Sequence, residues 1–296
     1  MNKKISDGNS MTKQRAVVEL LIADLFWGGA FVAVPFAQKS WDSSQISFIR
    51  FLIPVIMGLI LGMFLKSWKL SREEIRMGLI PGFFFAAVVY SQTIGLEYTT
   101  PSRSGFVTVL YIIFVPLLET YMNKKKLPPL FWFSILGALV GMGFLLNLNW
   151  SEWNIGDTIT FSSSLFSTWH IYQVGLLGKR FKHPILFNLS QCLWAAIFLF
   201  PFALMSHKSF IPSTINIDAI IAMSIITFGA TMIAFSIQAR VQAFLSASIS
   251  SILFLLEAPI AMFFSWMLLS EPISPSQLFG AFLILVSCVG AIFAHR

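Results

Sequence analysis

The sequence predicts an all-α membrane protein, a polytopic membrane bundle of ten transmembrane helices arranged as two inverted five-helix repeats. The prediction rests on an apolar composition, on ten apolar runs of membrane-spanning length, and on loops whose charge alternates between the two sides. Hydrophobic residues make up 56% of the 296 residues and charged residues 11%, against about 25% charged in a typical soluble domain. A soluble chain of this size could not bury so much apolar surface, which excludes a soluble enzyme, a disordered chain and a fibrous protein.

Ten apolar runs are each long enough to cross a bilayer. A hydrocarbon core of about 30 Å needs roughly 20 apolar residues per helix, and short loops separate the runs. No stretch remains for a soluble domain, and a polar segment, residues 1–16, precedes the first run. The predicted spans are residues 17–38, 43–65, 75–95, 102–122, 129–147, 156–177, 184–205, 216–238, 244–269 and 275–294.

Basic residues alternate between the loops in step with these spans. Of the 20 Lys and Arg residues, 16 fall in the termini and loops of one side, and only Lys39, Arg103 and Lys208 fall in loops of the other. By the positive-inside rule the richer side is cytoplasmic. We therefore expect a multi-pass protein of the cell (inner) membrane with both termini, including residues 1–16, in the cytoplasm. The net charge of +7 then reflects topology, and no nucleic-acid partner is expected.

The ten runs divide into five and five at the acidic loop 149–157. An odd number of helices per half makes the second half enter from the opposite side, as in an inverted-topology repeat. An offset of 146 residues aligns 98–104 with 244–250 and Tyr111 with Glu257, and an offset of 142 aligns Trp27 with Trp169. We therefore predict one repeat over residues 17–148 and a second over residues 149–296.

Several short motifs along the chain resemble those of one membrane-protein family. They are W-G-G-A-F-V at 27–32, F-I-R-F at 48–51, the stretch 96–106, G-D at 156–157, and the stretch 245–271 with S-A-S at 246–248. Together they resemble EamA-type members of the drug/metabolite transporter superfamily over nearly the whole chain. The sequence departs from the Tyr-Pro and Glu-Pro pairs usual in that family, because Ile112 follows Tyr111 and Ala258 separates Glu257 from Pro259.

The resemblance implies a fold and a class of activity. It implies a ten-helix bundle of two inverted repeats around a central cavity, and transport of small organic solutes, often outward. The substrates of the family include amino acids, nucleotide-related metabolites and toxic compounds, so the resemblance does not name a substrate.

Ionisable groups deep in the predicted spans are the first candidates for a functional site. Each costs at least about 2.5–3.5 kcal/mol at the bilayer centre, so it is expected to face a cavity or a partner. Glu257, Tyr111 and Trp27 lie near the middle of their spans, the depth at which transporters bind substrate. We predict that they line a cavity and that Glu257 binds a cation or couples to protons. The alternative for Glu257 is a structural hydrogen bond between helices.

Two further charged residues lie within the spans. Asp24 is a second candidate for proton coupling. Arg50 is predicted to bind a substrate carboxylate, and the alternatives are an ion pair with Asp24 or snorkelling to the outer surface.

Polar and aromatic residues at similar depth complete the predicted substrate site. They are Tyr90, Gln92, Trp169 and His170. His170 could relay protons or pack through a hydrogen bond. The two tryptophans, Trp27 and Trp169, could stack against an aromatic or cationic substrate or fill space between helices.

The chain lacks the motifs of several other chemistries. No G-x-x-x-x-G-K-[ST] loop is present, so direct use of ATP is not expected, and no catalytic residues, metal site or cofactor are predicted. The leading hypothesis is a secondary transporter for a small-molecule substrate, working by alternating access within membrane lipid as a monomer or homodimer, with export favoured and proton coupling left open. The alternatives are a membrane-embedded transferase acting on a lipid-linked substrate, and a channel.

Overall fold

A computed structural model describes residues 11–65, 69–124, 126–145, 153–181, 183–206, 208–211, 216–270 and 272–294. Within these ranges the chain forms helices joined by short turns and contains no strand. The first ten residues of the predicted cytoplasmic segment lie outside the described residues, and the first helix begins at Lys13, inside that segment.

The first half of the chain forms seven helices and the second half forms seven more with three irregular helical segments, counted over the described residues. The first seven are α1 (Lys13–Gln38), α2 (Ser43–Phe64), α3 (Arg72–Met77), α4 (Leu79–Gly95), α5 (Pro101–Val109), α6 (Tyr111–Asn123) and α7 (Pro129–Leu145). The others are α8 (Ile155–Leu177), η3 (Gly178–Arg180), α9 (Pro184–Leu204), α10 (Ile217–Ser224), η4 (Ile225–Ala234), α11 (Phe235–Gln242), α12 (Ala247–Leu253), η5 (Phe254–Leu256), α13 (Glu257–Leu269) and α14 (Pro275–Ala294).

The helices are those of a multi-pass membrane protein. Among the described residues, seven helical segments are long and apolar enough to cross a membrane, and α4 and α7 are shorter apolar helices of 17 residues. The remaining predicted span coincides with α8, whose many Ser and Thr residues lower its hydropathy. The count of ten crossings therefore stays a prediction.

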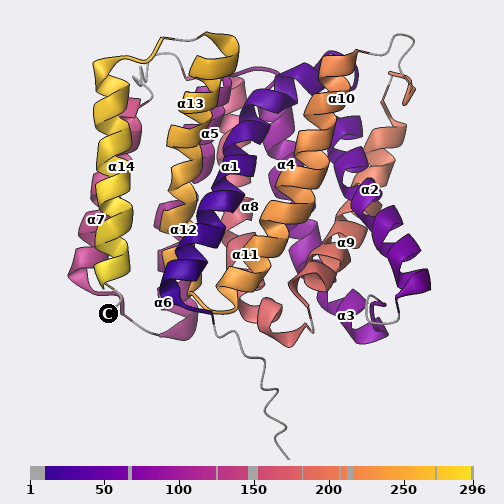
Figure 1. Cartoon of the computed structure of the whole chain (residues 1–296), viewed down its shortest axis with the longest axis horizontal. Coiled ribbons are helices and arrows are strands. Elements are labelled where there is room, and N and C mark those ends of the chain that lie inside the picture. The colour runs from indigo at the N-terminus through magenta and orange to yellow at the C-terminus, as the bar shows by residue number, and fades with distance from the viewer. Residues whose placement is uncertain are drawn as a thin grey trace, which may run out of the picture.

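The long helices lie side by side in one bundle (Figure 1). The start of α1 and the end of α14 lie at the same end of the bundle, at the bottom of the view, as an even number of crossings requires. At one edge α7 packs closely on α14: a Cβ atom on Gly141 would come within 2.8 Å of the Gly280 carbonyl oxygen. Gly137 and Gly141, four residues apart on α7, thus allow α7 and α14 to approach closely.

Two interrupted helices carry matching features 146 residues apart. The Thr100 side chain caps α5 and the Ser246 side chain caps α12, each accepting a hydrogen bond from the backbone N–H three residues on. The helix restarts at α6 in one half and at α13 in the other, and each of these ends in a left-handed residue, Lys124 (φ 52°) and Ser270 (φ 57°). The backbone therefore repeats the offset that aligns Tyr111 with Glu257.

A π-helical segment, η4, interrupts the helix between α10 and α11. The Thr231 hydroxyl donates to the Ile226 carbonyl, five residues back, at 2.9 Å. On α9 the Asn188 side-chain amide donates to the Thr231 carbonyl at 2.7 Å and to the Met232 carbonyl at 3.3 Å. A neighbouring helix thus satisfies carbonyls in this wider helical turn, and such π-helical segments often occur at functional sites.

Candidate functional site

A buried cavity lies between the helices of the two halves. Its volume is about 80 Å³, well below the roughly 300–1,000 Å³ of a typical small-molecule site. A solute of ordinary size therefore requires the surrounding helices to move apart. The polar and aromatic side chains that line the cavity are Trp27, Phe31, Arg50, Gln92, Thr108, Tyr111, Ser167, His170, Phe235, Gln238, Phe254 and Glu257.

Six of the eight residues predicted to bind substrate line this cavity: Trp27, Arg50, Gln92, Tyr111, His170 and Glu257. They come from α1, α2, α4 and α6 in the first half and from α8 and α13 in the second. The structure brings these side chains together, and their role in binding remains a prediction.

Glu257 and Tyr111 occupy equivalent places in the two halves. Each is the first residue after the interruption of its helix, and both are buried, with 7% and 4% of their surface exposed. Both side chains line the same cavity, one from each half of the chain. A phenol can donate a hydrogen bond to a carboxylate, so Tyr111 offers Glu257 a potential donor from the opposite half.

Arg50 extends from α2 to the π-helical segment. Its Nε donates to the Thr231 hydroxyl at 2.8 Å, and the side chain is buried. Guanidinium groups carry five N–H donors, so this hydrogen bond leaves donors available for a ligand in the cavity. Arg50 forms no ion pair with Asp24 among the described residues.

Aromatic rings hold Trp27 and His170 in place. The Trp27 ring lies between Phe235 and Phe254, with centroid distances of 5.1 and 5.2 Å, and its indole nitrogen has no hydrogen-bond partner among the described residues. The His170 ring stacks on Phe85 at 4.8 Å. The free indole N–H gives the cavity a donor that a ligand could satisfy.

A chain of side-chain hydrogen bonds leads away from His170. Its Nε2 lies 2.9 Å from Gln191 Oε1, and the Gln191 amide donates to Asn188 Oδ1 at 2.9 Å. The Asn188 amide also donates to the Ser236 hydroxyl at 3.2 Å. One ring nitrogen of His170 is therefore committed to the structure, which fits the packing alternative as well as a relay.

Tyr90 and Trp169 do not line the cavity. Tyr90 packs on Phe202 with a centroid distance of 5.2 Å. Trp169 is 39% exposed and stacks on Phe84. Successive residues of a helix point about 100° apart, so Trp169 faces away from the cavity that its neighbour His170 lines. Trp27 and Trp169 align at an offset of 142 residues, but only Trp27 faces the cavity.

Asp24 is fully buried and lies outside the cavity lining. Neither of its carboxylate oxygens has a hydrogen-bond partner among the described residues. A buried carboxylate without a partner is costly when ionised, which sets Asp24 apart from the paired carboxylates of Glu19 and Asp157.

The sequence predictions missed several lining residues. Thr108 lies one turn before Tyr111, and Ser167 lies one turn before His170. Residues three or four apart share a helix face, so this spacing could have identified both. Phe235 and Phe254 carry no such signal, because aromatic residues are common throughout the chain.

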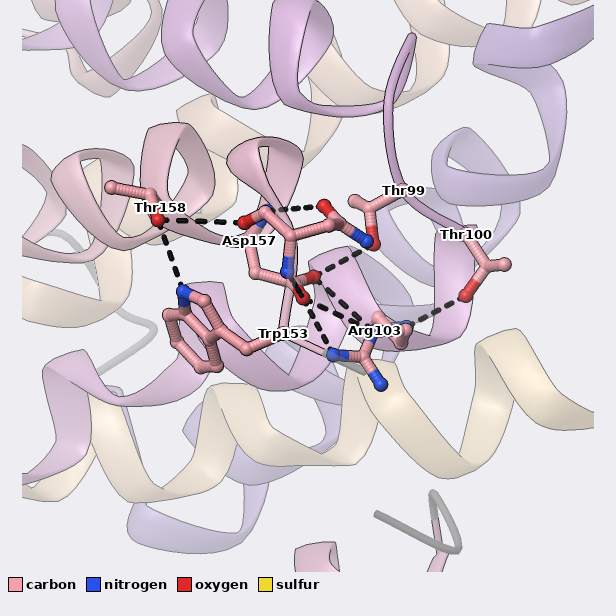
Figure 2. A network of polar contacts seen from close by, with 7 residues as sticks. Thr99, Thr100, Arg103, Trp153, Asp157 and Thr158 are labelled. Carbon is pink, nitrogen blue, oxygen red and sulfur yellow. Dashed lines mark hydrogen bonds and ion pairs between the residues drawn. The ribbon is translucent and has the colours of Figure 1, made fainter. Parts of the chain in front are cut away.

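An ion pair joins the start of α5 to the start of α8 at one end of these helices, and Figure 2 shows its contacts. Arg103 at the start of α5 contacts the Asp157 carboxylate through Nη2 at 2.5 Å and through Nε at 3.2 Å. Thr99 donates to the same carboxylate at 2.7 Å. Asp157 is fully buried and belongs to α8, so these contacts tie the first half of the chain to the second.

The same two halves approach closely beside this ion pair. A Cβ atom on Gly156 would lie 2.7 Å from the Gly95 carbonyl oxygen, so larger residues at position 156 would force α4 and α8 apart. The G-D pair at 156–157 therefore combines a close helix approach with the carboxylate that binds Arg103.

At the opposite end, Glu19 joins α1 to α11. Its carboxylate lies 2.9 Å from Arg15 Nε and 2.8 Å from Arg240 Nε. A second carboxylate also joins the two halves: Glu119 on α6 accepts hydrogen bonds from the backbone N–H and the hydroxyl of Ser248 on α12. Polar contacts therefore connect the two halves at both ends, with the cavity between them.

Comparison with known proteins identifies the family. The profile of the EamA-like transporter family matches the chain twice, over residues 14–147 and 155–293. The chain belongs to the EamA-like transporter family. A relative from Archaeoglobus fulgidus, described as an uncharacterized transporter, is 30% identical over 272 residues, which cover 91% of this chain and 83% of the relative. A crystal structure at 15% identity shares the fold, with a TM-score of 0.75 over 96% of this chain and 99% of the other.

Membership of the EamA-like family decides between the classes of function. The family and the relative are transporters, so this EamA protein is a membrane transporter and not an enzyme. The alternative of a membrane-embedded transferase is therefore wrong. Each half of the chain carries one EamA repeat.

Proposed function

We propose that this EamA protein is a secondary transporter that exports a small organic metabolite across the inner membrane by alternating access. The observation that carries the proposal is the meeting of Arg50 and Glu257, from different repeats, in one buried cavity. In this proposal the two repeats have inverted topology, the chain crosses the membrane ten times, both termini are cytoplasmic, and the protein works as a monomer or homodimer.

The cavity lining favours a substrate that carries both charges and an apolar part. Arg50 offers N–H donors to a carboxylate or another anionic group, and Glu257 offers an acceptor to an amine. Trp27 and Tyr111 offer ring faces and two further polar atoms. An amino acid or a nucleoside-like compound presents groups of these kinds.

Alternating access would use the ion pairs at the two ends of the bundle. Both Arg103–Asp157 and Arg240–Glu19 are formed in the structure, and the cavity between them is small. Opening toward one side would separate one pair while the other stays closed. The two repeats would then rock around Glu257 and Tyr111, consistent with transport sites at repeat interfaces.

Proton coupling is assigned to Glu257 and Asp24. Both carboxyl groups are buried, and their ionised forms are costly in hydrocarbon unless a partner is present. A proton on Glu257 would remove the charge that holds a cationic substrate group. Exchange of proton and substrate at this carboxyl would therefore link their movements.

Flux measurement in liposomes tests the proposal. Purified protein is first screened by thermal shift against amino acids, nucleosides and related metabolites, and each stabilising compound is then followed as labelled solute with and without a pH gradient. Saturable flux of the unchanged compound, accelerated by a proton gradient, is expected. Large ionic currents, or stabilisation without flux, would contradict the proposal.

Replacing Trp27 by Phe tests the free indole N–H. The variant keeps an aromatic ring between Phe235 and Phe254 but loses the donor, so we expect the KM for transport to rise about 5–10-fold, the equivalent of one hydrogen bond of roughly 1 kcal/mol. Trp169→Phe is the matched control and should leave KM unchanged. Equal effects of the two substitutions would remove Trp27 from the binding site.

A further inference from the structure

A second hollow lies on the side of the bundle, between α9 and the η4–α11 segment. Its volume is about 640 Å³, and it shares no lining residue with the central cavity. The hollow follows the η4–α11 helix from Met232 to Arg240, roughly 12 Å at 1.5 Å per residue. We refer to it as the lateral groove.

The wall of the lateral groove changes in character along its length. Ile185, Met232, Ile233 and Ile237 form an apolar wall, and His183 and Arg240 lie at one end. Ile233 is 44% exposed, and farther along the same helices the exposed side chains include Phe200, Leu204, Ile225 and Phe228. The groove therefore opens toward the hydrocarbon of the membrane.

Basic side chains lie at the polar end of the groove. Arg240 is half-exposed and uses its Nε on Glu19, which leaves other N–H donors of the guanidinium available. His183 makes no capping hydrogen bond to α9. Close packing of Gly178 on Ala239, with a Cβ distance of 3.1 Å to the carbonyl oxygen, brings the basic segment η3 beside the end of α11.

We propose that the lateral groove is a binding site for an anionic phospholipid. One acyl chain lies along Ile185, Ile233 and Ile237, and the phosphate lies between Arg240 and His183, with Lys179 and Arg180 of η3 nearby. Basic residues at this end and an apolar wall deeper in the bundle match the two parts of such a lipid. A water-soluble phosphate would use only the basic end and would leave the apolar wall exposed.

The site bears on the contact between the two halves of the chain. Arg240 belongs to the second half and its ion-pair partner Glu19 to the first, so a lipid phosphate would share Arg240 with Glu19. Ser236, which also lines the groove, is hydrogen bonded to Asn188 and through Gln191 to His170 in the central cavity. Lipid binding itself does not depend on the proposed transport function.

Thermal unfolding of the detergent-purified full chain tests the site without any flux measurement. The probes are dioleoyl phosphatidylglycerol, dioleoyl phosphatidylcholine and glycerol 3-phosphate. We expect phosphatidylglycerol to raise the unfolding midpoint by about 3 °C or more above the value in phosphatidylcholine, because only the native state holds the ligand. Glycerol 3-phosphate at the same concentration should have no comparable effect.

Two substitutions remove different parts of the groove. Ile233→Trp fills the apolar wall and keeps the Arg240–Glu19 pair, and Arg240→Gln removes the cation. Both should abolish the preference for phosphatidylglycerol, and Arg72→Gln, an exposed basic residue at the start of α3, should keep it.

Three results would overturn the proposal. Equal stabilisation by the two lipids would show that the head-group charge does not matter. An unchanged preference in both Ile233→Trp and Arg240→Gln would exclude this groove. Equal stabilisation by glycerol 3-phosphate would mean a site for free anions and not for a lipid.

Discussion

Transport should fall about 10–100-fold when Glu257 is replaced by Gln, with the protein still folded in the membrane. Gln preserves the size of the side chain but cannot carry a negative charge or exchange a proton. The range corresponds to the roughly 1.5–3 kcal/mol of a hydrogen bond to a charged group. The variant should also lose its response to a proton gradient, because Glu257 is the carboxyl that lines the cavity. Labelled-solute flux in liposomes at several pH values measures both effects.

The control for Glu257→Gln is Asp218→Asn, which makes the same type of change at an exposed carboxyl in the first turn of α10. This variant should transport as the natural protein does. Unchanged flux and an unchanged pH profile in Glu257→Gln, at equal amounts of reconstituted protein, would remove Glu257 from the mechanism and leave it with a structural role between helices.

Replacing Asp157 by Asn should have the largest effect on stability. The change leaves the Arg103 guanidinium facing a neutral amide, and removing one partner from a largely buried ion pair costs several kcal/mol. The Arg103 side chain retains 16% exposure, so we expect a loss of about 2–4 kcal/mol in the free energy of unfolding. Chemical denaturation of the detergent-purified variant measures it.

A double variant separates the ion pair from general damage at this end of the bundle. Arg103→Gln combined with Asp157→Asn should be less destabilised than the sum of the two single changes, because Arg103→Gln removes the guanidinium that Asp157→Asn leaves without its carboxylate. Glu73→Gln, at an exposed position, provides the neutral control. Strict additivity would mean that Arg103 and Asp157 act independently.

The unfavourable transfer of charged groups into hydrocarbon is the basis of two predictions from the sequence, namely the membrane spans and the main cavity residues. Charged groups are so costly in hydrocarbon that their depth alone indicates a cavity, which located Arg50 and Glu257. The offset of 146 aligned Tyr111 with Glu257, and the capping residues Thr100 and Ser246 extend that alignment to the backbone.

The facing of individual side chains was predicted less well. Trp169 and His170 are neighbours in sequence, yet only His170 lines the cavity. In a membrane both faces of a helix are apolar, so hydrophobic periodicity does not distinguish a lipid-facing ring from a cavity-facing one. Tyr90 was assigned to the site on depth alone and instead packs on Phe202.

Contacts between distant segments had no visible signal. The pairing of Arg103 with Asp157 joins residues from different repeats. In the sequence, Arg103 was used only as a loop charge that helps to orient the chain in the membrane. The hydrogen bond from Arg50 to Thr231 likewise depends on the π-helical segment, which has no composition that sets it apart from its neighbours.

The wider turn in η4 also alters how this helix must be compared with others. A helical wheel drawn at about 100° per residue separates Phe228 from Ile233 by 140°, although both are exposed on the bundle surface. A π-helical segment takes more residues per turn than an α-helix, so residues before and after η4 do not fall on one α-helical wheel. Phe235 and Gln238 line the cavity directly after this wider turn, so regular helical spacing counted from residues before 225 does not give their facing.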